Sequence, residues 1–196
     1  STYTMTIDVT AVNDAPTAAN NTVTTNEDTD HTFTASEFNF SDVDGDSLDH
    51  VSIETLPSNG TLLLDGVAVT LGQDIPAADI SNLVFRPAAD ANGASYDTFT
   101  FSVNDGTTDS ASTYTMTIDV TAVNDAPTAN DDTINVVSGT PATGNVVTSN
   151  DTDPDGDTLS VSAIAGGSPG SPITGTYGTF TLDSDGSYTY TVDTSN

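Results

Sequence analysis

The sequence contains no cysteine, no tryptophan and almost no positive charge. One basic residue, Arg86, stands against 29 acidic residues, and the formal net charge is −28. Without cysteine, a disulfide framework and a thiolate metal site are excluded. Without Lys and Arg, neither nucleic acid nor an anionic membrane surface is expected as a partner. No apolar run reaches the roughly 18 residues of a membrane-spanning helix, so membrane insertion is not predicted.

What the sequence does contain is a long internal repeat. Residues 1–18 recur letter for letter as residues 112–129, so Ser1 and Ser112 lie 111 residues apart. This offset has the size of an ordinary domain, not of a solenoid repeat of about 20–50 residues. The repeat therefore predicts three parts: the terminal strand of a missing upstream repeat (1–12), a complete unit (13–123) and a partial unit (124–196). We expect the chain to be a piece of a longer protein.

Strand signals with a period of two residues occur throughout. Tyr114, Met116, Ile118 and Val120 alternate with polar residues, as do their copies near the N-terminus. Strands are predicted at residues 21–25, 31–35, 48–56, 61–64, 67–71, 83–86, 98–103, 114–120, 179–182 and 188–192, with one helical turn at 76–82. Asp-Gly pairs such as Asp65-Gly66 predict tight hairpin turns. The predicted fold class is all-β: tandem antiparallel β-sandwiches, the second one incomplete.

Two acidic loops repeat at the same offset. Residues 42–46 read Asp-Val-Asp-Gly-Asp, and residues 153–157 read Asp-Pro-Asp-Gly-Asp. The carboxylates at alternate positions are Asp42, Asp44 and Asp46 in the first loop and Asp153, Asp155 and Asp157 in the second. At about 5 Å and an effective dielectric of about 20, each pair repels by roughly 3 kcal/mol. A hard cation removes this repulsion, and Ca²⁺, which takes six to eight oxygen ligands, suits the flexible spacing better than Mg²⁺.

The same loops have two other interpretations. A solvated acidic turn is the alternative to a cation site for either copy. An EF-hand is excluded, because its twelfth position would be Ser162 in the second copy and its first position would be Phe40 in the first copy.

Further motifs accompany the acidic loops. They are the hinge Val-Asn-Asp-Ala-Pro at 123–127 and segments 26–28, 85–87, 90–93 and 99–106. With these motifs, residues 13–123 resemble the cadherin-like tandem repeats of large bacterial adhesins of the RTX type. Residues 128–192 resemble a VCBS repeat, through segments 143–147, 150–157, 177–180 and 185–190. The resemblance implies immunoglobulin/cadherin-like sandwiches.

The resemblance also implies calcium ligands, because cadherins hold Ca²⁺ between consecutive domains. The junction between the two units is expected to use Glu27, Asp90, Asn124, Asp125, Asp153 and Asp155. The junction with an upstream repeat is expected to use Asn13, Asp14, Asp42, Asp44 and Asp105. The implied function is a calcium-rigidified extender of a secreted adhesin at the bacterial cell surface, supporting cell adhesion or biofilm formation. Its implied partners are the neighbouring repeats.

An alternative function is a carbohydrate- or protein-binding β-sandwich module of a secreted protein, although the sequence shows no aromatic cluster for such a role. An enzyme is not predicted. Residues 166–170 match the nucleophile pattern Gly-x-Ser-x-Gly, but they lie in a Ser/Pro/Gly-rich loop and both histidines precede them. His31 and His50 are expected to be exposed strand residues rather than ligands.

A last prediction concerns residues 1–12, which have no unit of their own. The second unit is expected to lack a closing strand, so one copy could complete another by homotypic strand exchange.

Overall fold

The computed structural model describes residues 1–194 and divides into two units, residues 1–123 and a second unit that begins at Asn124. Within the described residues, no helix has the length and apolar character needed to cross a membrane.

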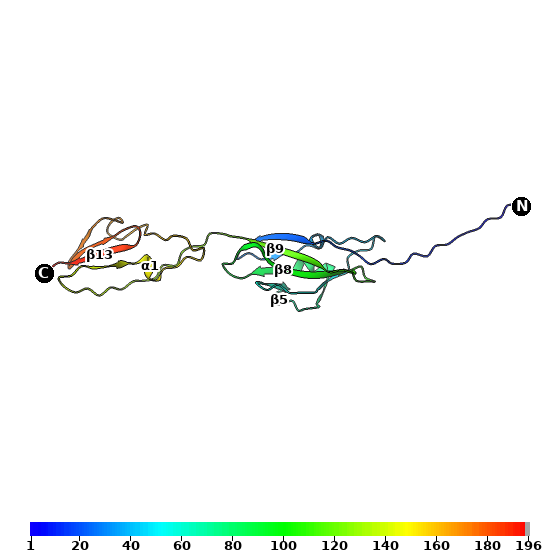
Figure 1. Ribbon diagram of the computed structural model, residues 1–196, viewed down its shortest axis with the longest axis horizontal. Helices are drawn as coiled ribbons and strands as arrows, with labels where there is room; N and C mark the ends of the chain where they lie inside the picture. Colours follow the sequence, from blue (N-terminus) through cyan, green and yellow to red (C-terminus); the bar gives the residue numbers. More distant parts are fainter. Residues whose placement is uncertain (195–196) are drawn as a thin grey trace. The chain divides into compact units, whose positions relative to one another are not determined.

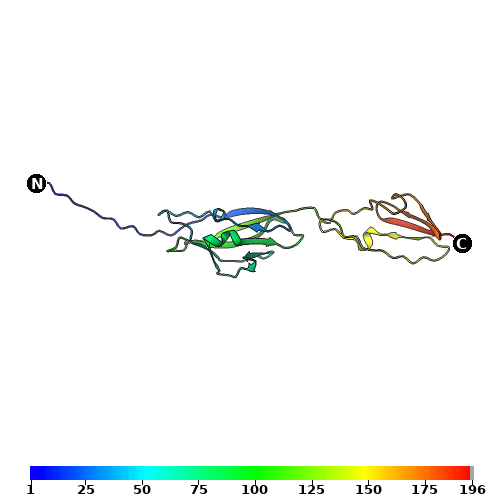
Figure 2. The same cartoon turned by 180° about the vertical axis from the view of Figure 1, so that it is seen from behind.

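The first unit is a sandwich of two sheets (Figures 1 and 2). One sheet has the order β1-β9-β8-β3-β6, with β1 (Asn21–Asn26), β3 (His50–Ile53), β6 (Asp74–Pro76), β8 (Gly93–Asn104) and β9 (Tyr114–Thr121). The other has the order β2-β7-β4-β5, with β2 (His31–Thr32), β4 (Gly60–Leu64), β5 (Val67–Ala68) and β7 (Leu83–Pro87). Two 3₁₀ helices, η1 (Ala35–Phe38) and η2 (Ala77–Asn82), connect strands. The predicted all-β class is confirmed.

The core of this unit lies between the two sheets. Phe85 from β7 and Phe99 and Phe101 from β8 are fully buried, and the ring of Phe33 meets that of Phe99 edge-on at 5.6 Å. Alternation along β7 buries Leu83 and Phe85 and exposes Arg86, as the sequence predicts. Burial of these large side chains is the main source of stability for the unit.

The strands β1 and β9 pair in parallel, from Asn21 opposite Met116 to Asn26 opposite Thr121. The other strand pairs within residues 1–194 are antiparallel, so this pair departs from the predicted antiparallel scheme. The eight residues of β9 span about 26 Å. Since β1 follows the entry of the chain into the unit and β9 precedes its exit, entry and exit lie at opposite ends of these strands.

Some predicted strands are shorter in the structure. The strand expected at 31–35 is only β2, because Thr34 starts η1 and its backbone N–H donates to Glu37 Oε2 at 2.7 Å. The strand expected at 48–56 is β3 alone. The predicted helical turn is η2, and the predicted hairpin around Asp65 is formed by β4 and β5.

The strand expected at residues 1–12 does not form in the structure, and Figure 1 draws this segment as a plain blue trace. The exposed fractions of Tyr3, Met5 and Ile7 are 95%, 85% and 76%. Within the first unit, the identical residues of β9 lie between β1 and β8.

The second unit has one four-stranded antiparallel sheet in the order β10-β13-β12-β11, with β10 (Ala142–Asn145), β11 (Ile173–Gly175), β12 (Gly178–Leu182) and β13 (Ser187–Val192). The hairpin predicted around Asp185-Gly186 is β12–β13. The pattern did not predict β10, β11 or the short helix α1 (Val147–Asn150), whose sequences show no apolar alternation. Val147 and Leu182 are the large apolar side chains that this unit buries within the described residues.

Candidate metal-binding clusters

At the entry end of the first unit, residues 12–16 repeat the hinge sequence of 123–127, and this entry hinge is fastened to the first acidic loop. Backbone hydrogen bonds of 2.8 Å run in both directions between Thr17 and Ser41. The N–H of Asp14 then donates to Asp44 Oδ2 at 2.7 Å. We call the residues gathered here the entry cluster: Asn13, Asp14, Asp42, Asp44, Asp46 and Asp105. The structure thus brings together all the residues predicted for the upstream junction.

Asp42 organises this loop and leaves one oxygen unused. Its Oδ1 accepts the backbone N–H groups of Asp44 and Asp46 at 2.8 and 3.1 Å. Its Oδ2 is inaccessible to solvent and has no hydrogen-bond partner among residues 1–194. A solvent-shielded carboxylate oxygen without a donor is costly unless a cation binds it.

The spacing of the three carboxylates suits a calcium ion. One oxygen each from Asp42, Asp44 and Asp46 lie within 4.8 Å of one another. Calcium–oxygen distances of about 2.3–2.6 Å allow two ligands of one ion to be separated by up to about 5 Å. The residues present therefore fit Ca²⁺, and backbone carbonyls and waters would complete its coordination.

Asp105 is buried and holds the hinge. Its Oδ2 accepts the Asn13 amide at 2.9 Å, and its Oδ1 accepts the N–H groups of Thr107 and Thr108 at 2.7 Å each. The amide nitrogen of Asn13 also donates a hydrogen bond to the backbone carbonyl of Asp14. Both bonds use the nitrogen of Asn13, so its amide oxygen is the atom that suits a cation. Asp105 is best placed to position Asn13.

The exit end of the unit carries a second set of polar side chains, the exit cluster: Glu27, Asp28, Asp90 and Asn92. Glu27 follows β1, and its Oε1 accepts the N–H of Val123 at 2.5 Å while its Oε2 accepts the Asn92 amide at 2.9 Å. Glu27 thereby ties Val123, the first residue of the hinge at 123–127, to the body of the unit.

Asp28 belongs to this cluster, although only Glu27 of segment 26–28 was predicted to be a ligand. Its Oδ1 accepts the N–H of Asp90 at 3.3 Å, and carboxylate oxygens of the two residues lie within 4.8 Å. Both have positive φ, 55° and 54°, a conformation that Asp tolerates better than most residues. The sequence feature that could have indicated Asp28 as a ligand is its position next to Glu27, with which it forms an acidic pair.

The second unit repeats the hinge–loop network of the first. Thr128 and Thr152 exchange backbone hydrogen bonds of 2.8 and 3.0 Å, as Thr17 and Ser41 do. Four side-chain bonds recur at the 111-residue offset: Asn124 to the Asp125 carbonyl (2.8 Å), Asp125 N–H to Asp155 (2.7 Å), and the Asp155 and Asp157 N–H groups to Asp153 Oδ1 (3.0 and 3.1 Å). Because the sequence around the loop has diverged, this recurrence marks the network as one structural module.

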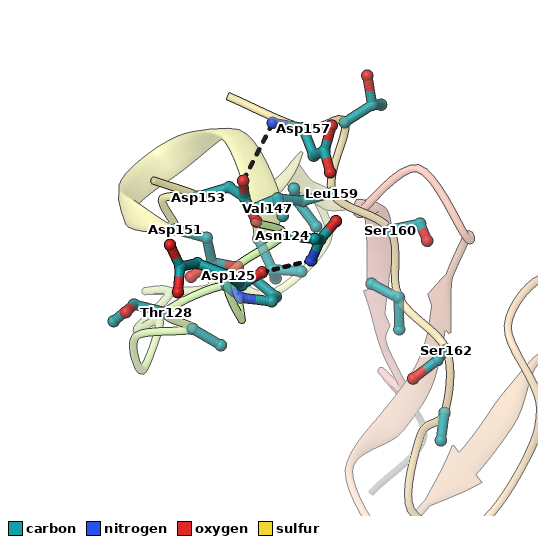
Figure 3. Close-up of a pocket in the computed structure, with 16 residues that line it drawn as sticks. Asn124, Asp125, Thr128, Val147, Asp151, Asp153, Asp157, Leu159, Ser160 and Ser162 are labelled. Carbon is teal, nitrogen blue, oxygen red and sulfur yellow. Dashed lines mark hydrogen bonds between the residues drawn. The ribbon is translucent and has the colours of Figure 1, made fainter. Parts of the chain in front are cut away.

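A pocket of about 490 Å³ adjoins this second network (Figure 3). Asn124, Asp125, Asp153 and Asp157 line it together with apolar residues such as Leu159. No aromatic residue is among its lining, so it lacks the stacking surface expected of a glycan site. Its oxygen-rich lining is compatible with a cation.

Hydrogen bonds at both ends of the first unit favour the ionised carboxylates. The Asn92 amide and the Val123 N–H lower the pKa of Glu27 below its ordinary value of 4.5. The Asn13 amide and the N–H groups of Thr108 and Thr107 lower the pKa of Asp105 below its ordinary value of 3.8. Each carboxylate therefore stabilises the fold fully above its unfolded pKa, and that stabilisation is lost as pH falls through the folded pKa.

A pH prediction follows for the protein in chelator. Between pH 5 and pH 3, the melting temperature of the double variant Glu27→Gln/Asp105→Asn should fall by less than that of the parent. Thermal melts monitored by circular dichroism measure this, with the exposed Asp8→Asn as the control that keeps the parental slope. Since acid also relieves repulsion among other carboxylates, the difference between variant and parent is the diagnostic quantity. If the melting temperatures of variant and parent fell equally with pH, ionised Glu27 and Asp105 would not be the groups that stabilise the fold.

The remaining chemical candidates are embedded in the sandwich or in loops. His31 lies 3.2 Å from Glu37, and His50 lies 2.8 Å from Asp49; both side chains are half-buried rather than exposed as expected. Residues 166–170 lie in turns around a single bridge between Ile164 and Gly167, without the strand and helix that a nucleophile elbow requires.

Two families match the chain. Residues 13–121 match the family described as "Bacterial Ig domain", and residues 124–196 match "Bacterial cadherin-like domain". The immunoglobulin/cadherin-like prediction is confirmed, but the cadherin-like match falls on the second unit, where the sequence suggested a VCBS repeat. The hinge and acidic loop occur in both units, so they could not distinguish the two families. The VCBS and RTX resemblances stay predictions.

Comparison with curated protein sequences gives no match. Two solved structures resemble the chain, the endo-fucoidan hydrolase MfFcnA4 from glycoside hydrolase family 107 and a variant of it. They share 16% and 17% identity, each with a TM-score of 0.35, over 92% and 93% of this chain. The chain spans 25% of the length of each, and a likeness of this degree carries no argument.

The family matches agree with the module found in both units. Domains of these families are usually extracellular and typically non-enzymatic, and cadherin-like domains generally bind calcium. The immunoglobulin-type match covers more than half of the sequence. The chain therefore belongs to the bacterial Ig domain family, with a bacterial cadherin-like domain following in its second unit.

Proposed function

We propose that this chain is a calcium-rigidified extender of a secreted bacterial adhesin at the cell surface, supporting adhesion or biofilm formation. The observation that carries the proposal is the hinge–loop module, which recurs at the 111-residue offset and leaves Asp42 Oδ2 shielded from solvent without a donor. Bound Ca²⁺ would supply the positive charge that holds the clustered carboxylates together.

The residues of the module act on the hinge itself. Asp155 accepts the N–H of Asp125 and thereby attaches the hinge to the unit that the chain enters. Glu27 accepts the N–H of Val123 and attaches this first residue of the hinge to the unit that the chain leaves. Val123 and Asn124 are neighbours in sequence, so fixing both attachments removes most of the free backbone torsions between them.

Without a cation, these attachments are opposed by repulsion among the carboxylates. Each close pair costs roughly 3 kcal/mol at an effective dielectric of about 20. Cation binding offsets this repulsion, so stiffness becomes dependent on calcium. Sites of this kind bind at about 10⁻⁴–10⁻³ M in extracellular modules, which would confine the stiff state to calcium-rich surroundings.

The two ends of the first unit suit a spacer. Entry and exit clusters lie beyond opposite ends of β9, so each unit adds length to a tandem chain. A distal binding domain carried on such a chain would be held away from the cell surface.

Small-angle scattering tests this proposal. Calcium is expected to increase the maximum dimension of the 196-residue chain and narrow its distance distribution relative to chelator. Asp155→Asn should abolish most of this response, whereas Asp185→Asn, in the β12–β13 turn, should retain it. Identical scattering curves in calcium and chelator would refute the extender function.

A further inference from the structure

The first unit contains two Asn-Gly pairs, Asn59-Gly60 and Asn92-Gly93. In such a pair, the backbone nitrogen of the glycine can attack the side-chain carbonyl carbon of the asparagine, because glycine has no side chain to hinder the approach and few restrictions on its backbone torsions. The attack closes a succinimide ring, which water later opens to an acid. Both asparagines are exposed, so the water that this reaction consumes can reach either of them.

The structure immobilises the first pair. The N–H groups of Asn59 and Gly60 both donate to Asp97 Oδ2, at 2.7 and 2.9 Å, and the Asn59 amide donates to the carbonyl of Tyr96 at 2.9 Å. The ring of Phe85 fills the space beside Gly60 where a side chain would lie. The nitrogen of Gly60 and the side chain of Asn59 are therefore kept from reacting until this loop opens.

The second pair lies in a more open setting, between the turn at 89–90 and the body of β8. A Cβ added to Gly93 would meet no atom within 4 Å. The register of β8 against β9 shifts between Gly93 and Asp97, so regular strand pairing is interrupted directly after the pair. The Asn92 amide donates to Glu27 Oε2 at 2.9 Å, and breaking this contact frees the side chain to turn toward the nitrogen of Gly93.

We propose that Asn92 is a site of spontaneous deamidation in the folded protein and that Asn59 is protected from it. The nitrogen of Gly93 forms a bond to Cγ of Asn92, and the bond from Cγ to the amide nitrogen breaks, which releases ammonia. Water then breaks one of the two bonds between the Gly93 nitrogen and the ring carbonyls. Cleavage at Cγ gives an ordinary aspartate, and cleavage at the backbone carbonyl gives an isoaspartate whose main chain runs through the former side chain.

The product changes the charge of the exit cluster. Glu27 is 3% exposed, and the Asn92 amide is one of the donors to its carboxylate. Deamidation replaces this donor by a carboxylate, which joins those of Glu27, Asp28 and Asp90. Without a cation, the lost hydrogen bond and the added repulsion destabilise the exit end of the unit. The reaction itself does not depend on the proposed calcium function.

Peptide mapping by mass spectrometry tests the proposal on the 196-residue chain after incubation in mildly alkaline buffer. Chymotrypsin, which cleaves after aromatic residues and leucine, places Asn92 in peptide 86–96 and Asn59 in peptide 49–62. In the folded protein, conversion to the acid is expected to be at least about tenfold faster at Asn92 than at Asn59, because the loop that holds Asn59 must open first. In concentrated urea the two rates should converge, since the tertiary contacts that distinguish the pairs are lost.

Two substitutions at Asn92 separate the reaction from its consequence. Asn92→Gln keeps a side-chain amide but would have to close a larger ring, so peptide 86–96 should no longer gain acid while peptide 49–62 behaves as in the parent. Asn92→Asp reproduces the ordinary product, and in chelator it should melt about 5 °C below the parent. Asn82→Asp, which adds the same charge at an exposed position of η2, should melt like the parent.

Two results of the peptide mapping would overturn the proposal. One is equal conversion of Asn59 and Asn92 in the folded protein. The other is a peptide 86–96 that gains acid in urea but not in the folded state. If Asn92→Asp melted like the parent in chelator, the inferred effect of deamidation on the exit cluster would be wrong.

Discussion

Replacing Asp42 by asparagine is expected to abolish the calcium-dependent stabilisation of the first unit. In the parent, calcium at a hundredfold excess over its dissociation constant should stabilise the folded state by about 2.7 kcal/mol. For a unit of this size, that free energy raises the melting temperature by about 10 °C. The variant should gain close to nothing from calcium.

The physical reason is that the two carboxylate oxygens of Asp42 have different roles. Oδ1 of Asp42 holds the loop through the N–H groups of Asp44 and Asp46, and Oδ2 is the shielded atom left for a cation. Asparagine can keep the loop bonds with its oxygen, but it then presents an amide nitrogen to the cation. Its neutral side chain also lowers the repulsion in the loop, so the variant should melt no lower than the parent in chelator.

Differential scanning calorimetry in calcium and in chelator measures this effect, and hydrogen exchange at β8 and β9 assigns the transition to the first unit. Asp65→Asn is the matched control, because Asp65 is an exposed acid in the β4–β5 turn whose positive φ of 51° asparagine also tolerates. It should retain the full calcium response. The same response in Asp42→Asn would show that calcium binds elsewhere or not at all.

The second large effect is expected at Asp97, an acid that serves the fold rather than a cation. Its side chain is 5% exposed. Oδ1 accepts the N–H groups of Ser58 and Thr98 at 3.0 and 2.9 Å, and Oδ2 accepts those of Asn59 and Gly60 at 2.7 and 2.9 Å. Asp97 thus fastens the loop before β4 to β8.

Asp97→Ala should lower the free energy of unfolding by roughly 4 kcal/mol, because several backbone donors lose their acceptor at once. Asp97→Asn should cost nearly as much, since its amide nitrogen would face two N–H donors in place of an oxygen. Urea unfolding measures both values, which should be the same in calcium and in chelator.

Asp74→Ala provides the comparison for Asp97. Asp74 is exposed; it accepts a hydrogen bond from the Ser52 hydroxyl and lies 3.8 Å from His50 Nε2. Both contacts are at the surface, so its loss should cost less than about 0.5 kcal/mol. If Asp97→Asn unfolds like the parent, the buried-acceptor account is wrong. A cost that appears only in calcium would instead make Asp97 a metal ligand.

The candidate site was predictable where its signals are local. The hinge and the acidic loop are short, contiguous and repeated, and the structure brings Asp14 to Asp44 and Asp125 to Asp155 as the repeat suggested. Asp28 was not predicted as a ligand, because its place in the cluster depends on Asp90, which lies 62 residues along the chain. The sequence could not distinguish Asp97 from the other acidic residues. Asp97 is buried by a loop that is distant in sequence, and the residues next to Asp97 do not indicate this burial.

The sequence by itself determined the repeat length, the all-β class, the inward faces of strands such as β7 and β9, and the two acidic loops. These follow from side-chain alternation and turn chemistry, which act over a few residues. Only the tertiary structure decided that β1 and β9 run parallel, that Asp97 is a buried anchor, and that Asp28 lies beside Asp90. Those outcomes depend on which segments, far apart in the sequence, are brought together by packing, and the pattern of neighbouring residues does not encode this.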